Sequence, residues 1–587
     1  MNRFLLRAAL PAGVVCLFTG CIDNNYDLSD IDTTSELKVQ DLVLPVNLDS
    51  IRLDDIIEID DDSKIKIVEL DGRKIYAVTE SGTISSDPIF ISDFSAPAPA
   101  VESSQAIFAM SQASTRTAVS DFYSFSSFTP QTVSYLAEDI DEAILEVTAL
   151  DVVPMVINIH FQASGLGANT SMKFETLNVD FLKGLTISNL PSNFKYNPVS
   201  GLLEVTDLPF SGNHADINLT ATAINLSQAG SQLKDHSLAY ASEIDVLSGV
   251  LQTTTENPGP SDRPQSITFD VTTTVGDLNA TAIDGRIEYS LSGDDLNIDP
   301  VDLSDIPDFL AGDETDIRLV NPQIYLSLNN PLATEKLNIT SGIELTSHRT
   351  DESSTFNLDA GQQILIGHNH GDGPYNVVLS PSMPATPLPE YAANLTHVGY
   401  KSLSNVLAGA GLPYSIDISL IEPGVPSQTV SGFPLGVELR KVEGSYEFFA
   451  PLALADGDNA SVIVYSTTED GWSDEDVDKI TITSLTVSAL ATSDLPLGAT
   501  VSVVPFDKFG NEYEGIVITP GQIAANAKDE ALEVVITPSK ENPIRNLDGV
   551  RIRAVVKSAS TTTLSPDQSI TLKKVRAKVS GSYTTDF

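Results

Sequence analysis

Apolar and polar residues alternate along most of this chain in short runs, and this two-residue period is typical of β-strands. Val, Ile, Thr, Ser and Tyr fill the runs, which end at Gly, Pro, Asn or Asp. Residues 64–69 and 73–78 alternate around Asp71-Gly72, a dipeptide that can take the positive φ angles of a tight hairpin turn. The pattern predicts an all-β protein. Helical periodicity is confined to short stretches near 137–147, 404–411 and 521–532.

Length and internal repetition predict several domains. A chain of 587 residues is too long for one hydrophobic core. Strand, proline loop and strand recur from Val147, Tyr325 and Val487, which indicates repeated modules. We therefore expect several tandem antiparallel β-sandwich domains of the immunoglobulin-like kind. The expected division is 1–20 signal peptide, 21–45 acidic tether, 46–139 small β domain, 140–309 β-sandwich, 310–440 β-sandwich and 441–587 C-terminal β-sandwich.

The N-terminus has the three parts of a secretory signal peptide. Arg3 and Arg7 supply positive charge, and Ala8–Phe18 is apolar. Gly20, a small residue, stands directly before Cys21. As a helix the apolar run would be about 16 Å long, well short of the ~30 Å hydrocarbon core of a bilayer. The segment therefore predicts export and not a transmembrane helix.

The segment Leu17-Phe18-Thr19-Gly20-Cys21 resembles the lipobox of bacterial lipoproteins, although Leu stands one position earlier than usual. The resemblance implies that Cys21 becomes the first mature residue and carries acyl chains such as palmitate, which anchor the protein in a membrane. Residues 21–27 resemble the acidic stretches that follow the cysteine in surface lipoproteins of the Bacteroidetes. They imply a lipid-anchored outer-membrane protein, with the cell surface favoured over the periplasmic face.

Charge is the outlier in an otherwise ordinary globular composition. The chain has 80 Asp plus Glu against 33 Lys plus Arg, a formal net charge of −47, while 41% of its residues are hydrophobic. Such a field repels nucleic acid, so we expect no nucleic-acid partner. Of the two cysteines, Cys16 leaves with the signal peptide and Cys21 is acylated. The mature chain then has no disulfide to form.

Signatures of catalysis are missing. The sequence has no Gly-x-Ser-x-Gly, no His-Glu-x-x-His and no phosphate-binding loop, so we expect a protein that is not an enzyme. Ca²⁺ prefers oxygen ligands, and the calcium candidates lie in two acidic turns, although solvated loops are the simpler interpretation: Asp456, Asp458, Asp470 and Asp474. No other cofactor is expected. His368 and His370 could face one metal from a strand, but the Gly-Asp-Gly-Pro after them favours a turn.

The candidate ligand-binding residue is Trp472. It is the single Trp and lies in an acidic turn, where an exposed ring could support a sugar. The favoured function is a non-enzymatic outer-membrane lipoprotein that binds a glycan or a protein partner at the cell surface. One alternative is an adhesin or fimbria-associated structural subunit, because Bacteroidetes fimbrial proteins combine a lipobox with tandem sandwiches and some assemble by strand donation. A second alternative is a secreted glycan hydrolase with an unrecognised carboxylate site.

Two C-terminal segments are basic, although the chain as a whole is acidic. Basic and apolar residues alternate in 551–557 and again in 574–579. Ile570 and Leu572 have the opposite parity, which predicts a β-bulge near Lys573-Lys574. If both strands shared a sheet, their basic side chains would form one stripe on an acidic molecule.

Overall fold

The computed structural model describes residues 34–46, 51–53, 57, 59, 63–100, 102–109, 118–126, 128–167, 169–256, 266–291, 297–304, 306, 310, 312–350, 352–370, 374–470, 480–561 and 563–586. Strands account for 62% of the structure and helices for 4%. The strands form antiparallel sheets that pack face to face, with one parallel pair at β25 and β26. The predicted all-β fold of tandem β-sandwiches is confirmed. Among the described residues, no helix is long and apolar enough to cross a membrane.

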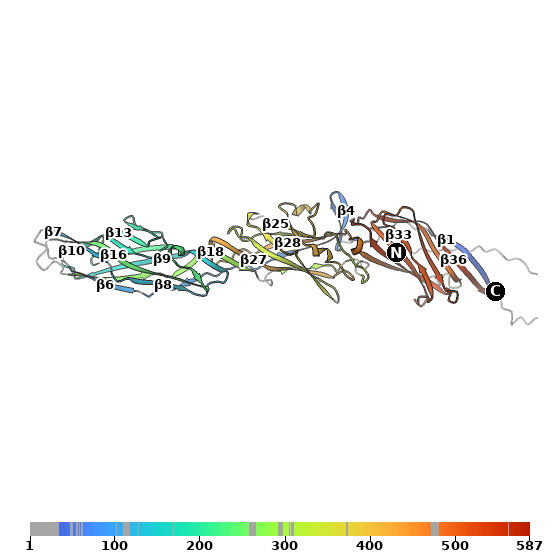
Figure 1. The fold of residues 1–587 in the computed structure, drawn as a ribbon, viewed down its shortest axis with the longest axis horizontal. Helices are drawn as coiled ribbons and strands as arrows, with labels where there is room; N and C mark the ends of the chain where they lie inside the picture. The colour runs from blue at the N-terminus through green and yellow to red at the C-terminus, as the bar shows by residue number, and fades with distance from the viewer. Residues whose placement is uncertain are drawn as a thin grey trace, which may run out of the picture.

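Figure 1 shows an elongated molecule in which three modules follow one another in a line. We call them the distal, middle and terminal modules, and β1 and β36 lie in the terminal module at the right. The chain runs along the three modules in one direction and then returns. The described part begins in the terminal module with β1, reaches the distal module by β6, and returns to the terminal module for β29–β36.

The distal module is a sandwich of two sheets. One contains β6, β17, β9, β14 and β11, and the other contains β7, β8, β16, β10, β13, β12 and β15. Its elements are β5 (Ser95–Ala96), β6 (Glu102–Ala109), β7 (Ala118–Ser126), β8 (Gln131–Ala137), β9 (Ile144–Ser164), β10 (Thr170–Asp180), β11 (Leu185–Ile187), β12 (Phe194–Tyr196), β13 (Leu202–Pro209), β14 (His214–Asn225), α2 (Leu226–Ala229), β15 (Leu233–Lys234), β16 (Ser237–Glu256), β17 (Ser266–Val275) and β18 (Leu278–Ser290).

Phenylalanine side chains fill the space between the two distal sheets. The ring of Phe174 lies 5.2 Å from that of Phe161 and 5.7 Å from that of Phe269, centroid to centroid. Phe108 of β6 and Phe125 of β7 meet at 5.2 Å across the sandwich. Because strand residues alternate between faces, each buried Phe leaves polar neighbours in the sequence on the outer surface.

The middle module shares a sheet with the distal module. Long strands continue from one to the other in the order β14-β9-β18-β27-β22, so the two modules are joined by main-chain hydrogen bonds. The elements are β3 (Ile65–Leu70), β4 (Arg73–Ser85), β19 (Asn297–Ile298), β20 (Val301–Asp302), β21 (Gln323–Leu328), β22 (Ile339–His348), β23 (Ser353–Asn357), β24 (Ile364–Ile366), η3 (His368–His370), β25 (Tyr375–Ser380), η4 (Pro389–Tyr391), β26 (Thr396–Gly399), η5 (Lys401–Asn405), β27 (Ser415–Pro434), β28 (Glu443–Pro451) and η6 (Gly457–Asn459).

The terminal module packs the sheet β1-β36-β30-β34-β32 against the sheet β29-β35-β31-β33. Its first strand comes from the start of the described chain and its last from the end, since Thr34 pairs with Asp586. The elements are β1 (Thr34–Val46), β2 (Ile51–Arg52), β29 (Val462–Glu469), β30 (Ile480–Ser493), β31 (Leu497–Asp507), β32 (Ile516–Thr519), β33 (Gly521–Ile523), β34 (Glu530–Pro538), β35 (Leu547–Ser558) and β36 (Ser569–Asp586).

The strand pairing corrects the expected domain boundaries. All the described residues of the expected tether 21–45 belong to β1, which pairs with β36. The expected small domain 46–139 is divided among all three modules, because β2 pairs with β36, β4 with β28, and β7 with β16. The boundary near 440 also moves, since β28 belongs to the middle module. Local alternation identifies a strand but carries no information about a distant partner.

The expected helical stretches are also wrong. Residues 137–147 are the end of β8, a loop and the start of β9, and 521–532 hold β33 and part of β34. Near 404–411 only the short η5 and turns are found. In each stretch, apolar residues from two elements and the loop between them imitate a helical period.

Two local predictions are confirmed. Asp71 and Gly72 have φ angles of 53° and 70° and connect β3 to β4 in a two-residue turn. In β36, Arg576 pairs with Ser488 and Lys573 with Leu490, so two residues of β36 stand opposite one of β30. This is the predicted bulge, and Lys574 takes a φ of 54° there.

The basic stripe is not formed. β35 and β36 lie in opposite sheets of the terminal module, so their basic residues do not share one face. In β35, Arg551 pairs with Glu512 at 2.7 Å and Arg553 with Glu314 at 2.8 Å. Acidic side chains of the same chain therefore neutralise part of the charge that the stripe would have presented.

Candidate functional site

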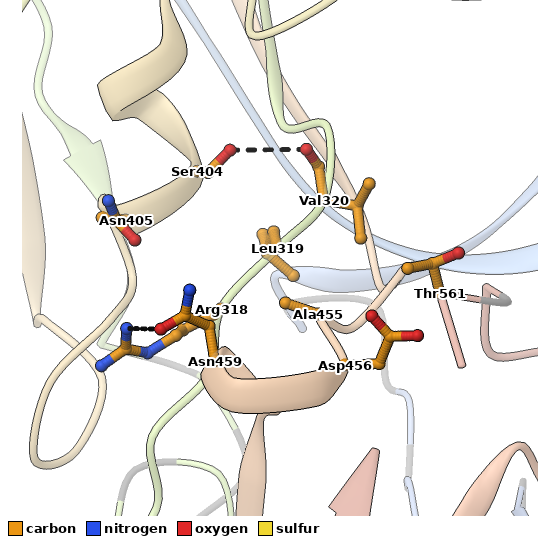
Figure 2. A pocket seen from close by; sticks show the side chains of 9 residues that line it. All are labelled: Arg318, Leu319, Val320, Ser404, Asn405, Ala455, Asp456, Asn459 and Thr561. Carbon is orange, nitrogen blue, oxygen red and sulfur yellow. Dashed lines mark hydrogen bonds between the residues drawn. The ribbon is translucent and has the colours of Figure 1, made fainter. Parts of the chain in front are cut away.

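The calcium candidates Asp456 and Asp458 lie at the joint between the middle and terminal modules. Asp456 precedes η6 and Asp458 lies within it. Asp456 lines a crevice of about 260 Å³ (Figure 2), whose other lining residues are Arg318, Leu319, Val320, Ser404, Asn405, Ala455, Asn459 and Thr561. Most of the lining residues belong to the middle module, and Thr561 follows β35 of the terminal module.

A guanidinium group occupies one side of this crevice. Arg318 Nη2 lies 3.0 Å from Asp316 Oδ2, and its Nη1 donates to Asn459 Oδ1 at 3.4 Å. Figure 2 shows the Arg318 guanidinium and the Asp456 carboxylate on opposite sides of Asn459. Ca²⁺ needs six to eight oxygen ligands. Among the described residues, no three acidic, histidine or cysteine side chains are grouped to hold a metal, and the nearby cation disfavours one.

The other predicted site residues do not form one site, and some of them lie outside the residues that the structure describes. Asp470 follows the last residue of β29 and is exposed. Asp474, Trp472 and Cys21 lie outside the described residues. His368 is not on a strand but in η3, where its Nδ1 lies 2.8 Å from Asn338 Oδ1.

A site that the sequence predictions missed covers the outer face of the distal sheet β6-β17-β9-β14. Strand pairing aligns polar side chains in rows that run across this sheet. We call these residues the distal polar face: Gln105, Asp270, Gln162 and His214 in the first row, Ser103, Thr272, His160 and Asp216 in the second, and Thr274, Asn158 and Asn218 in the third. None of them is Lys or Arg.

Hydrogen bonds hold the side chains of the second and third rows in place. His160 Nδ1 lies 2.7 Å from Asp216 Oδ1, and the imidazoles of His160 and His214 stack at 5.7 Å. Asn158 Nδ2 donates to Asn218 Oδ1 at 2.8 Å and to Asp216 Oδ1 at 3.2 Å. The side chains of His160 and Asp216 remain 34% and 31% exposed, so their unused donors and acceptors can still reach a ligand.

The Asp216 carboxyl is held in its charged form. Desolvation alone would raise its pKa, but hydrogen bonds from His160 and Asn158 and the charges of His160 and His214 outweigh desolvation, so the pKa lies below its usual value. In the first row, Gln105 Nε2 donates to Asp270 Oδ1 at 2.6 Å. The face therefore presents hydrogen-bonded carboxylate, amide and imidazole groups on one side of the sheet.

The sequence contains a signal for this face. In β9, Asn158, His160 and Gln162 alternate with buried Ile and Phe. In β14, Asp216 and Asn218 alternate with buried Ala, Ile and Leu. Planar hydrogen-bonding side chains at successive outward positions of these strands are therefore informative. Their alignment into rows, however, depends on which strands pair.

A separate hollow of about 520 Å³ lies over β3, β4 and β28, and Glu447, Lys64, Lys66 and Glu80 help to line it. Burial raises the pKa of the Glu447 carboxyl and Glu390 raises it further, against a hydrogen bond from Tyr391 and the charge of Lys66. Glycoside hydrolysis needs two carboxyl groups. Glu80, the other carboxyl that lines the hollow, is bound by Lys64 at 2.7 Å.

Comparisons with known proteins leave the family open. No family model and no curated protein matches the chain. A solved structure of a candidate secreted protein from Parabacteroides distasonis is 15% identical and has a TM-score of 0.36, over 50% of this chain and 89% of that one. A candidate membrane-anchored protein from Corynebacterium diphtheriae is 10% identical with a TM-score of 0.13, over 86% and 97% of the two chains. Scores this low support no argument about function.

Proposed function

We propose that the chain is a non-enzymatic outer-membrane lipoprotein, anchored through Cys21, whose distal polar face binds a neutral glycan at the cell surface. The observation that carries the proposal is the alignment of that face into rows across four strands. The face lies in the module farthest along the line from β1 and β36 (Figure 1). An anchor upstream of β1 would hold the terminal module near the membrane and present the distal module outward.

The chemistry of the distal polar face suits a polyhydroxylated ligand. Sugar hydroxyl groups both donate and accept hydrogen bonds, and the face offers carboxylate acceptors, amides that do both, and imidazoles. Hydrogen bonds between its side chains already fix them, so binding orders few new groups. Asp216 and Asp270 add negative charge to a molecule of net charge −47, which disfavours anionic glycans and favours neutral ones.

A glycan array probed with the soluble fragment 22–587 tests the proposal. We expect binding to neutral glycans, and we expect Asp216→Ala with Asn218→Ala to abolish it, because Asp216 and Asn218 accept the hydrogen bonds that order the second and third rows. The matched control is Asn178→Ala on the opposite sheet, where Asn178 Nδ2 donates to Ser248 Oγ at 3.1 Å. Equal glycan binding by the wild type and the double variant would refute the assignment to this face.

A specific feature of the terminal module favours an adhesin or fimbria-associated subunit as the second candidate. β1 is an edge strand supplied by the start of the described chain, and of the strands it pairs only with β36. A terminal strand at an edge can be exchanged between copies. Mixing a fragment that starts at residue 47 with a 34–46 peptide, and sizing the mixture beside the fragment 22–587, tests this function. Strand exchange predicts that the added peptide binds the shortened fragment in the place of β1.

A further inference from the structure

The most exposed large apolar side chain among the described residues is Phe509, which is 77% exposed. It lies in the turn 507–511 that follows β31. Where β31 begins, Leu497 pairs with Ser558, whose amide bonds to Ser461 next to the middle module. β31 then runs to Asp507, so Phe509 lies at the end of the terminal module that points away from the other two modules.

The start of the described chain lies at the same end. β30 runs in the opposite direction to β31, and its first residue, Ile480, pairs with Tyr583. Three residues further along β36, Asp586 pairs with Thr34, the first residue of β1. Thirteen residue steps separate Thr34 from Cys21, and a fully extended chain of that length reaches at most about 45 Å. A lipid anchor at Cys21 therefore keeps this end of the molecule close to the bilayer.

The turn that carries Phe509 is held by its own hydrogen bonds. Asp507 Oδ1 accepts from the amides of Phe509 and Asn511, each at 2.9 Å, and the Gly510 amide donates to the Asp507 carbonyl at 2.8 Å. Gly510 takes a φ of 80°, which glycine adopts without strain. A fixed turn presents the ring to solvent without the entropy cost of ordering a mobile loop.

A cation lies beside the exposed ring. Lys508 Nζ is 5.3 Å from the centre of the Phe509 ring, which places an ammonium group where a lipid phosphate could pair with it. Of the acids next to it in the sequence, Asp507 accepts hydrogen bonds from the backbone of the turn and also interacts with the charge of Lys508, and Glu512 is paired with Arg551 at 2.7 Å. An aromatic ring with an adjacent cation is a combination that favours the boundary between lipid head groups and acyl chains.

We propose that Phe509 and Lys508 form a membrane-contact site that enters the interface of the bilayer in which Cys21 is anchored. The inference rests on the proposed lipid anchor. The ring leaves water for the head-group region, and the ammonium group pairs with lipid phosphates. Together with the acyl chains, this contact gives the molecule a second attachment point and limits how it tilts on the membrane.

Site-specific fluorescence of the full lipidated chain tests the proposal. Phe509→Cys places the only free thiol in the mature protein, because Cys21 is acylated. The protein is labelled with an environment-sensitive dye and reconstituted in vesicles of phosphatidylethanolamine and phosphatidylglycerol with spin-labelled lipid. Ile107→Cys is the matched control, since Ile107 is 66% exposed in the distal module. We expect a blue shift and strong quenching at position 509 and neither at position 107.

The outcomes separate the inference from the anchor. If both labelled proteins float with the vesicles and the dye at position 509 behaves as it does at position 107, the membrane-contact site is refuted while the anchor stands. If neither protein floats, the anchor is refuted and the contact site with it. Thermal melting of each variant confirms that the substitutions leave the fold intact.

Discussion

The distal and terminal modules are both β-sandwiches, but their cores are built differently. In the distal module Phe161, Phe174 and Phe269 are fully buried and belong to a core cluster that continues into the middle module. The terminal module has two smaller clusters of Ile, Leu, Val and Ala, and among its described residues Phe506 is the one buried aromatic side chain. Each buried aromatic ring removes more apolar surface from water than an aliphatic side chain. We therefore expect the distal core to contribute more to the free energy of unfolding.

This difference fits what each module has to do. The distal polar face depends on four strands staying in register, and a large continuous core resists local shifts. In the terminal module, β1 is an edge strand. It comes from the N-terminal part of the chain, whereas the other strands of the module, apart from β2, come from the C-terminal part. We expect the two regions to unfold in separate transitions, with the terminal module first.

The largest effect is expected for Phe174→Ala. Phe174 is fully buried and its ring lies within 5.8 Å of four other Phe rings, so truncation leaves a cavity that should cost about 3–5 kcal/mol. Calorimetry should show the distal transition lowered and the terminal transition unchanged. Leu532→Ala, in the terminal core, is the reciprocal control. If either substitution moved both transitions equally, the modules would not be independent.

A smaller effect is expected for Gly581→Ala in β36. A Cβ at this position would collide with the backbone carbonyl of Thr481 in β30, and relieving the clash should cost about 1–3 kcal/mol. Gly498→Ala in β31 is the matched control, because its Cβ would meet nothing nearer than 3.5 Å. Denaturant titration of the terminal transition should separate the two variants, and identical midpoints would show that β36 and β30 can move apart at no cost.

Features that depend only on residues adjacent in the sequence could be predicted from the sequence. The Asp71-Gly72 turn follows from backbone preferences of two residues, and the bulge near Lys574 follows from a change of parity within one strand. The pairing of β1 with β36 could not be predicted, because alternation is the same for any partner. The distal polar face was missed for this reason: its first row joins Gln105, Asp270, Gln162 and His214, which only long-range pairing brings together.

The middle module should respond to pH through Glu447. Burial and Glu390 raise the pKa of its carboxyl in the folded state above that in the unfolded chain. Folding therefore favours the protonated form, and stability falls as pH rises from the unfolded pKa through the folded pKa. Glu447→Gln removes this charge. The variant should melt at a higher temperature than the wild type at pH 7.5, and the gap should close below the unfolded pKa of about 4.3. A gap that persisted at pH 3.5 would assign the effect to packing and not to ionisation.

The smallest effect is expected at the joint of the terminal and middle modules, where Arg553 Nη2 lies 2.8 Å from Glu314 Oε1. Both side chains are largely exposed, at 38% and 66%, so water and salt screen their attraction and the pair should contribute about 0.2–1 kcal/mol. A double-mutant cycle of Arg553→Ala and Glu314→Ala should measure this coupling in the terminal transition at low salt. The coupling should shrink in 1 M NaCl, where screening extends over only about 3 Å. A larger coupling that did not change with salt would contradict a weak, screened surface attraction.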